Sequence, residues 1–338
     1  MKTVLQSDEG RPVADYVRTL ERAGTWLTSQ QRSDGSSGDG LSLWAYYTQP
    51  MALRATGHPA AANRCLQHIK DKFLLEKGTM DVKRDGLEGI AYAPGWTVVN
   101  AHQWERFDIS FPVSSWIVGL QDKETGAFYS TFDDAKRKKG LLEYEATIMG
   151  GHAMISTGRL ENAQKVGDFL IKLHKSQPDI KNNYYFMWDK ETGVQTDFDE
   201  KLAMFYVLDK HKDLQGYFNF GLSISLLARL YGATGKREYL KLAKDHFDFV
   251  DACRGTYNSA LAHKLAWADA ILYQMTGEEK FLRGAKKVGD YLIGVQKKDG
   301  RYHYKEIVPK FEDQPLTANL DIVSQFTTWI AQVRACLK

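Results

Sequence analysis

Crowded carboxyl groups are the first feature of this sequence that could carry out chemistry. The segment QTDFDEK, residues 195–201, contains Asp197, Asp199 and Glu200. Neighbouring carboxylates raise one another's pKa, so that one of them can keep a proton and deliver it to a substrate. Asp199 is therefore a candidate proton donor, although most acidic triplets in a loop are solvated surface charge.

Further ionisable side chains interrupt segments that are otherwise apolar and helix-like, such as LLEYEATIMGGH, TYNSALAHKLAW and PLTANLDIVSQF. When a helix is covered on most sides, such a side chain must either form a hydrogen bond or face a solvent-filled cavity. The candidates for proton transfer are, besides Asp199, the residues Glu143, Glu145, His263, Lys264 and Asp321.

Aromatic and amide side chains occur in the same segments and are candidates for binding a substrate. The face of an aromatic ring stabilises a desolvated cation by roughly 1–2 kcal/mol. For any one amide, a structural hydrogen bond to a neighbouring loop is the simpler explanation. The candidates for substrate binding are Trp44, Tyr47, Trp96, Asn100, Tyr217, Asn219, Asn258, Trp267 and Asn319.

Composition restricts the class of protein. The chain has 338 residues, of which 43% are hydrophobic and 26% charged, with a net charge of +3. It has no basic block with interleaved aromatics, so we expect no nucleic-acid partner. It has neither a run of about 18 apolar residues nor an apolar leader, which predicts no membrane span and a cytoplasmic location. Three widely spaced cysteines fit a reducing compartment. The oligomeric state stays open.

Internal repeats predict the elements that must position these residues. KVGDYLIGVQKKDG from Lys287 has a near copy, KVGDFLIKLHKSQPD, from Lys165. Thr-Gly followed by a short polar step occurs at Gly57, Gly158, Gly235 and Gly277, each between two apolar-periodic runs, and a further break is expected around Phe107. A glycine in the left-handed conformation at the end of a helix explains each site, so we predict tight helical hairpins.

The hairpins give twelve predicted helices in one domain, residues 1–338. The odd-numbered helices are predicted at 12–31, 59–75, 109–121, 160–176, 237–252 and 279–297. The even-numbered helices are predicted at 41–56, 94–106, 141–156, 216–233, 257–275 and 315–336. Short extended pieces are expected only in loops, near Tyr184 and Arg301.

A recurring pattern resembles a known architecture. Helix, Gln, Asp-Gly turn and aromatic recur through the chain, as in SSWIVGLQDKETGAFYS and KVGDYLIGVQKKDGRYHY. This pattern resembles the QW-type repeats of the terpenoid cyclases and protein prenyltransferases, which implies an (α/α)6 toroid. Other (α/α)6 families, among them sugar epimerases, glycoside hydrolases and polysaccharide lyases, share the helical count.

The resemblance also implies specific site residues. The segment from Asp197 to Glu200 is similar to the Asp-x-Asp-Asp acid of class II terpene cyclases, but Glu200 stands where the last Asp belongs. Asp251 and Cys253 are similar to the Asp-x-Cys zinc pair of prenyltransferases. Zinc needs three or four ligands and the sequence names only these two securely, so we predict no metal. Phosphate-cradling loops are missing, and we predict no cofactor.

The connections between helices alternate between short and long. The Thr-Gly links are short, whereas residues 76–93, 122–140 and 177–215 form long links, and long structured loops in a compact domain are usually functional. They predict a cavity mouth where the even-numbered helices begin. We therefore expect a cofactor-independent acid-base enzyme, a cyclase, isomerase or dehydratase, acting on a small apolar terpenoid- or polyketide-like substrate. The alternatives are a carbohydrate epimerase, hydrolase or lyase, and a non-catalytic helical-repeat binding protein.

Overall fold

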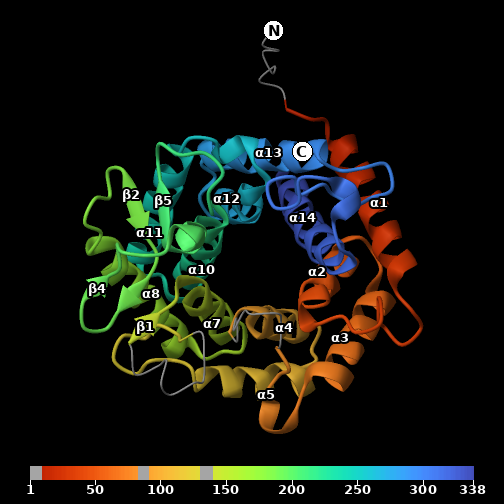
Figure 1. The fold of residues 1–338 in the computed structure, drawn as a ribbon, viewed down its shortest axis with the longest axis horizontal. Helices are drawn as coiled ribbons and strands as arrows, with labels where there is room; N and C mark the ends of the chain where they lie inside the picture. The colour runs from red at the N-terminus through yellow and green to blue at the C-terminus, as the bar shows by residue number, and fades with distance from the viewer. Residues whose placement is uncertain (1–9, 83–90, 130–139) are drawn as a thin grey trace, which may run out of the picture.

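The computed structural model describes residues 10–82, 91–129 and 140–338 and arranges twelve helices in two concentric rings (Figure 1). The outer ring consists of α1 (Val13–Gln30), α3 (Pro59–Phe73), α5 (Phe107–Val118), α8 (Leu160–Lys175), α11 (Arg237–Asp251) and α13 (Glu279–Gly294). The inner ring consists of α2 (Gln49–Ala55), α4 (Tyr92–Gln103), α7 (Tyr144–Ser156), α10 (Phe218–Thr234), α12 (His263–Thr276) and α14 (Leu316–Cys336). This architecture confirms the predicted (α/α)6 toroid.

Contacts between the first and last hairpins close the ring. The last inner helix, α14, packs against α12 on one side and against α2 on the other, and α1 contacts both α13 and α14. Because each outer helix precedes its inner partner, all six inner helices run in the same direction. Their first turns therefore meet at one end of the toroid.

The short turns from inner to outer helices follow the predicted glycines. Gly57, Gly158, Gly235 and Gly277 have φ angles of 80°, 75°, 70° and 70°, in the left-handed region. The expected break before Phe107 is a turn in which Glu105 takes a φ of 57°. The predicted hairpin turns are thus confirmed, and four of them use the residue type that adopts this conformation at least cost.

Two inner helices, α2 and α12, begin at least six residues later than predicted. The predicted helix 41–56 is a 3-10 turn, η1 (Leu43–Ala45), followed by α2, in which Pro50 stands in the first turn. A proline fits there because the first helical N–H groups have no partner within the helix. The predicted helix 257–275 starts as two 3-10 turns, η4 (Thr256–Asn258) and η5 (Ala260–Ala262), before α12. Ser259 caps η5 by accepting a hydrogen bond from the Leu261 amide.

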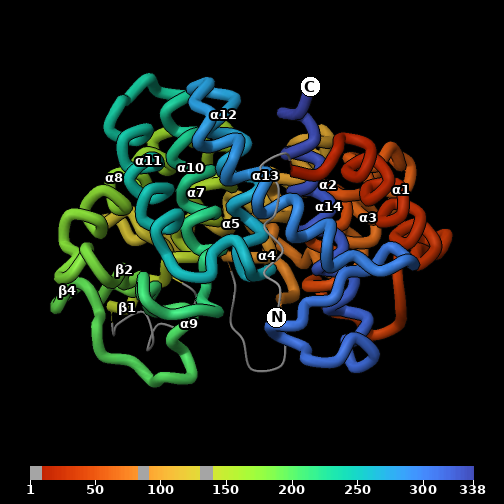
Figure 2. Tube along the Cα trace, turned by 90° about the horizontal axis from the view of Figure 1, so that it is seen from above, coloured from red at the N-terminus to blue at the C-terminus, as the bar shows by residue number. Residues whose placement is uncertain are grey.

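Small β elements occupy the long connections, on the side of the ring that faces down in Figure 2. The strands β1 (Leu141–Leu142), β3 (Trp188–Asp189) and β4 (Gly193–Val194) form one antiparallel sheet, and β2 (Asn183–Tyr185) pairs with β5 (Val207–Asp209). The remaining described pieces are η2 (Glu76–Gly78), η3 (Glu200–Leu202), α9 (Ala203–Tyr206) and η6 (Phe311–Asp313). The extended piece predicted near Tyr184 is confirmed as β2, and Tyr302 forms an isolated bridge with Gln296.

The repeated glutamine at the end of an outer helix connects neighbouring outer helices. The side-chain amide of Gln31 donates to the carbonyl of Ala61 on α3, and that of Gln121 donates to the carbonyl of Asn162 on α8, both at 2.9 Å. Gln296 donates in the same way to Thr19 on α1, also at 2.9 Å, which connects the last outer helix to the first. The glutamine repeat thus helps to hold the outer ring together.

The turn glycine that follows each of these glutamines lies against the same neighbouring helix. A Cβ at Gly35 or Gly300 would come within 2.2 and 2.3 Å of a backbone carbonyl oxygen, that of Arg64 on α3 and that of Arg22 on α1. No side chain fits at such distances. The Asp-Gly part of the repeat therefore allows close packing, and the glutamine supplies the hydrogen bond.

An aromatic layer fills the middle of the inner ring. The rings of Trp267 and Trp329 stack at 4.8 Å, and Trp96 packs against both at 5.5 Å. The imidazole of His152 lies against Trp267 at 5.3 Å. Because these rings come from α4, α7, α12 and α14, they separate the two ends of the toroid.

Candidate functional site

All six inner segments bring side chains together at the end of the ring where the inner helices begin. The group includes charged, amide, phenol and aromatic side chains, and we call it the polar cluster. It consists of Tyr47, Tyr92, Glu145, Phe218, His263, Lys264, Asp321 and Gln325.

Lys264 lies at the centre of the polar cluster. Its side chain starts on α12, is only 3% exposed, and carries its ammonium group to 4.9 Å from the ring of Phe218 on α10. The same nitrogen is 5.8 Å from the ring of Tyr92 on α4, on the opposite side of the inner ring. Gly221 permits this arrangement, because a Cβ there would come within 2.5 Å of the Lys264 carbonyl carbon. A glycine on α10 thus brings the backbone that carries Lys264 close.

His263 hydrogen-bonds to Lys264 in an arrangement that allows a proton to change place. Its Nδ1 lies 2.9 Å from the Ala260 carbonyl and donates to it, so that in the neutral ring Nε2 accepts from the Lys264 ammonium at 2.9 Å. Gln325 Oε1 lies 3.2 Å from the same Nε2. That second contact is favourable only when Nε2 carries a proton, because an amide oxygen is an acceptor. The geometry therefore suits a proton shared between Lys264 and His263.

Gln325 is held in one orientation by its other contacts. Its side-chain nitrogen donates to Asp321 Oδ1 at 2.8 Å and to the hydroxyl of Tyr47 at 3.0 Å. Because a carboxylate oxygen only accepts, the amide nitrogen must face Asp321 and the amide oxygen must face His263. Gln325 thus links Asp321 to His263, and its contact with His263 becomes a hydrogen bond when Nε2 of His263 carries a proton.

Glu145, in the first turn of α7, brings an unusually weak carboxylic acid into the polar cluster. Its Oε1 is shielded from solvent and has no hydrogen-bond partner among the described residues. Burial and the nearby carboxylate of Glu143 raise the pKa of Glu145 to about 8, although the positive charge of Lys264 acts in the other direction. Glu145 therefore keeps its proton near neutral pH.

Lys264 responds to the same surroundings in the opposite sense. Burial lowers its pKa from the usual 10.5 to about 8, while Glu145 and Asp321 act to raise it. Burial together with the positive charge of Lys264 also lowers the pKa of His263, which is neutral at pH 7. A carboxylic acid and an amine with similar pKa values near neutrality can both give and take a proton, which is the requirement for general acid-base catalysis.

Aromatic rings form one wall of the polar cluster. Trp44 stacks on Tyr92 with ring centroids 5.6 Å apart and meets Tyr47 edge-on at 5.5 Å. Burial raises the pKa of Tyr304, and the nearby charges of Glu306, Asp321 and Glu145 act in the same direction. The phenols of Tyr47 and Tyr92 also have raised pKa values, chiefly because they are buried. Neutral phenols of this kind can donate hydrogen bonds.

The structure brings together most of the residues proposed for proton transfer. Glu145, His263, Lys264 and Asp321 belong to the polar cluster, and Glu143 acts on it through its charge. Asp199 does not: it is exposed on the surface, and its carboxylate caps η3 by accepting a hydrogen bond from the Lys201 amide at 3.0 Å. Asp199 is therefore not among the residues that we propose for proton transfer.

The proposed substrate-binding residues fall into three groups. Trp44 and Tyr47 border the polar cluster. The amides Asn100, Asn219 and Asn319 bond to backbone carbonyls, Tyr217 bonds to the Arg254 carbonyl, and Asn258 is exposed. These five side chains thus have structural contacts or lie at the surface. Trp96 and Trp267 belong to the aromatic layer.

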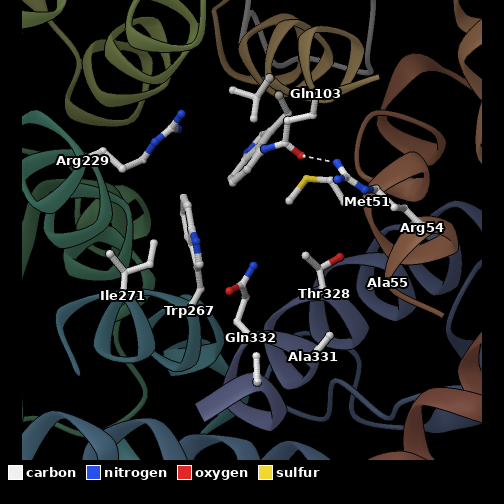
Figure 3. A pocket seen from close by; sticks show the side chains of 13 residues that line it. Met51, Arg54, Ala55, Gln103, Arg229, Trp267, Ile271, Thr328, Ala331 and Gln332 are labelled. Carbon is white, nitrogen blue, oxygen red and sulfur yellow. Dashed lines mark hydrogen bonds between the residues drawn. The ribbon is translucent and has the colours of Figure 1, made fainter. Parts of the chain in front are cut away.

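A cavity that the sequence did not predict lies at the opposite end of the ring from the predicted mouth. It has a volume of about 710 Å³ and opens where the inner helices end and the short turns lie (Figure 3). Small side chains leave this space, namely Ala55 on α2 with Ala331 and Ala335 on α14. At the predicted end, the larger side chains of the polar cluster meet one another across the ring axis. The length of the loops did not reveal this difference.

The residues considered for zinc binding make other contacts. Asp251 accepts a hydrogen bond from the hydroxyl of Tyr257, and Cys253 lies against the Phe249 carbonyl at 3.3 Å. Of the two later histidines that could supply a third ligand, His263 belongs to the polar cluster and His303 contacts the Val308 carbonyl at 3.0 Å. Within residues 10–82, 91–129 and 140–338, no group of three or more His, Cys, Asp or Glu side chains is arranged to hold a metal ion.

Sequence reasoning missed several members of the polar cluster and the charged wall of the cavity. Tyr92 stands just before the predicted helix 94–106 but in fact opens α4, and Tyr304, which lies near the polar cluster without belonging to it, is in a loop. Phe218 reads as an ordinary core aromatic. Arg229 had a usable signal, because it is a charge within the apolar run FGLSISLLARLYG.

In the part of the chain that the structure describes, no helix is long and apolar enough to cross a bilayer.

Comparisons with known proteins show the fold alone. No protein-family model matches the chain, and no curated protein sequence matches it. Solved structures match over nearly the whole length. A D-mannose isomerase superimposes with a TM-score of 0.70 at 12% identity, covering 97% of this chain and 100% of the other. A family 76 α-mannanase from Bacteroides thetaiotaomicron gives 0.66 at 11% identity, covering 95% and 96%.

A third solved structure extends the range of chemistry found on this fold. The type II terpene cyclase from Scytonema, bound to merosterolic acid A, matches with a TM-score of 0.59 at 11% identity, covering 96% of this chain and 99% of that one. The chain thus has the (α/α)6 toroid fold that an isomerase, a glycoside hydrolase and a cyclase share. All three of these structural neighbours are enzymes; two are named for mannose or mannan and the third is a terpene cyclase.

Proposed function

We propose that this protein is an acid-base enzyme that moves a proton on a small, oxygen-bearing molecule bound at the polar cluster. The observation that carries the proposal is the pairing of Glu145 with Lys264: a carboxylic acid of raised pKa and an amine of lowered pKa meet in one buried site. Such opposed shifts are typical of groups that serve as acid and base at neutral pH.

The roles follow from the hydrogen bonds. Glu145 is the proton donor, because its raised pKa keeps it protonated and its Oε1 has no hydrogen-bond partner among the described residues. Lys264 takes up a proton from the substrate in its uncharged form, which its lowered pKa of about 8 makes accessible, and His263 with Gln325 orients its amine. Tyr47 and Tyr92 supply donors for the oxygen atoms of a substrate. No cofactor is needed for these steps.

The polarity of the polar cluster favours an oxygen-rich substrate, such as a sugar or a hydroxylated carbonyl compound, over a purely apolar one. A cyclase that forms carbocations needs free aromatic faces. The faces of Tyr92 and Phe218 are already directed at the ammonium group of Lys264. This supports a carbohydrate-type substrate over a terpenoid-like one. Isomerisation and epimerisation are the reactions that such a site can carry out by proton transfer alone.

A terpenoid- or polyketide-like substrate is the second candidate. The observation in its favour is the continuous aromatic wall of Trp44, Tyr47 and Tyr92, which would suit the apolar part of such a molecule. A carbonyl or hydroxyl group on it would still have to meet Glu145 and Lys264. Both candidates therefore depend on the same two residues.

Hydrogen exchange in D₂O tests the proposal even when the product is not identified. A panel of aldoses, ketoses, hydroxy acids and polyketide-like ketones would be incubated with the protein, and deuterium at carbons next to a carbonyl followed by NMR. We expect exchange in at least one oxygen-rich compound. Glu145→Gln and Lys264→Met should each slow it by roughly 10²–10⁴-fold, the usual contribution of a general acid or base.

The surface variant Asp199→Asn serves as the matched control, since it also removes one carboxylate charge, and it should exchange at the wild-type rate. Folding of every variant would be checked by circular dichroism. If both cluster variants fold and keep full activity, the proposed roles are wrong. If the protein retains small molecules from a cell extract but catalyses nothing, the binding-protein alternative holds instead.

A further inference from the structure

The proposed function leaves the 710 Å³ cavity at the opposite end of the ring unused. Its volume falls within the range of sites for small molecules. Trp96 and Trp267 of the aromatic layer line its inner part, and Figure 3 shows Arg54 and Met51 entering from α2, on the other side from Arg229 and Trp267. The cavity is thus a separate compartment, on the far side of the aromatic layer from the polar cluster.

The charge of the cavity has one sign. Its lining includes Arg54 and Arg229 and contains no aspartate or glutamate. Neither arginine forms an ion pair with a carboxylate of the described residues. The remaining polar groups of the wall are amides and a hydroxyl, from Gln103, Gln332 and Thr328. Such a lining attracts an anion and offers neutral donors around it.

Arg229 is held in place by two neutral partners. Its Nη1 lies 3.0 Å from His152 Nδ1, and its Nη2 donates to Ser156 Oγ at 3.1 Å. His152 can accept there because its Nε2 faces the carbonyl of Leu222 at 3.3 Å and carries the proton. A guanidinium has five N–H donors, and these two bonds leave the others for a ligand.

Burial makes an unpaired guanidinium costly. Desolvation lowers the pKa of Arg229 to about 10, which still leaves it charged at neutral pH. Arg229 is only partly exposed, and its two neutral partners, His152 and Ser156, replace only part of the hydration that a guanidinium loses in such a place. An anion that binds in the cavity would supply the missing charged partner.

Capping of a helix C-terminus does not explain why Arg229 stands at this position in the cavity. Cations are favourable at the C-terminal ends of helices, and this cavity lies at such ends. Arg229, however, lies more than one turn before the end of α10, and its two hydrogen bonds go to side chains of α7. Arg54 also bonds sideways, to Gln103 of α4 at 3.5 Å, as the dashed line in Figure 3 marks.

We infer that this cavity binds a small organic anion, with a carboxylate at Arg229 and a flat apolar body against Trp96 and Trp267, while Arg54 adds positive charge from the opposite wall. A planar carboxylate matches the fork geometry of a guanidinium, and indole rings offer flat surfaces for the body. The inference is independent of the proposed function, because no residue of the polar cluster lines the cavity.

Isothermal titration calorimetry with 1-naphthoate tests the inference, with 1-naphthalenemethanol as the uncharged analogue. We expect naphthoate to bind the full chain at least about tenfold more tightly than the alcohol. Arg229→Gln should weaken naphthoate binding by about tenfold or more, and Arg54→Gln by a smaller factor. Arg237→Gln, which removes an exposed arginine at the start of α11, is the matched control and should bind as the wild type does.

Two more variants keep the test decisive. If Arg229→Gln does not fold, Ala331→Phe fills the cavity from α14 and should weaken naphthoate binding as strongly. Lys264→Met removes the cation at the other end and should leave naphthoate affinity unchanged. The inference is overturned if naphthoate does not bind at millimolar concentration, if the alcohol binds equally well, or if only Lys264→Met lowers the affinity.

Discussion

At the scale of single residues, the environment of Glu145 gives the molecule a pH-dependent stability. The folded-state pKa of Glu145 is raised from the usual 4.5 to about 8, so the folded state holds this proton more tightly than the unfolded state does. The resulting stabilisation is fully present below about pH 4.5 and is lost as the pH rises towards 8.

We predict that the free energy of unfolding of the wild type, relative to that of Glu145→Gln, falls as the pH rises from 4.5 to 8. Urea denaturation at a series of pH values measures it. A difference that is flat across this window would show that Glu145 titrates normally.

The sequence identified most ionisable members of the polar cluster but not their arrangement. Glu145, His263, Lys264 and Asp321 were found because each is polar in an apolar helix. The same criterion also selected Asn100, which bonds to backbone carbonyls, and Asn319, which bonds to backbone carbonyls and to the Gln314 side chain. Polarity within a covered helix shows that a side chain needs a partner, but the partner depends on the rotation of each helix in the ring. That rotation is a tertiary property.

At the scale of elements, the glutamine repeat has a testable role in stability. Gln121 donates to the carbonyls of Gly126 and Asn162 and accepts from the Asn162 side chain at 2.6 Å. We predict that Gln121→Ala lowers the free energy of unfolding by about 1–3 kcal/mol, because it leaves buried carbonyls without donors. Thermal or urea denaturation measures the loss.

The matched control for this prediction is Gln30→Ala. Gln30 also lies at the end of an outer helix, but its side-chain nitrogen reaches only the hydroxyl of its neighbour Ser29. Its replacement should change the free energy of unfolding by less than about 0.5 kcal/mol. Equal losses in Gln121→Ala and Gln30→Ala would mean that the repeat does not tie the outer helices together.

The hairpin turns allow a second test at this scale. Gly158 has a φ of 75°, and a Cβ added there would meet no atom within 4 Å. Gly158→Ala should therefore destabilise by about 1 kcal/mol through backbone strain alone, and Gly158→Asn by less, since Asn tolerates this conformation. Denaturation curves that place Gly158→Ala level with the wild type would contradict the strain.

Helices and turns were well predicted because their signals are local. An apolar period followed by Gly is enough to end a helix at the residues before Gly235 or Gly277. The late start of α2 had a local signal too, since Pro50 belongs in a first turn. The position of the cavity had none, because it depends on which inner helices carry small side chains at which end.

At the scale of the whole molecule, the toroid is a ring with two different ends. The first turns of the inner helices join in the polar cluster, and their last turns surround a cavity whose charged side chains are arginines. The aromatic layer of Trp96, Trp267 and Trp329 separates them. Because α12 carries both Lys264 and Trp267, a ligand on the indole side contacts the same helix that holds the proton-transferring amine.

The most direct test of the central claim is the titration of Lys264 in the intact protein. With ¹³C-labelled lysine, NMR would follow its ε-carbon signal, assigned by its absence in Lys264→Arg, over a pH range that covers both the lowered pKa of about 8 and the usual 10.5. A pKa of about 8 is the predicted result. A pKa at the usual 10.5 would contradict the account, because Lys264 would then be an ordinary solvated cation with no means of exchanging a proton with Glu145.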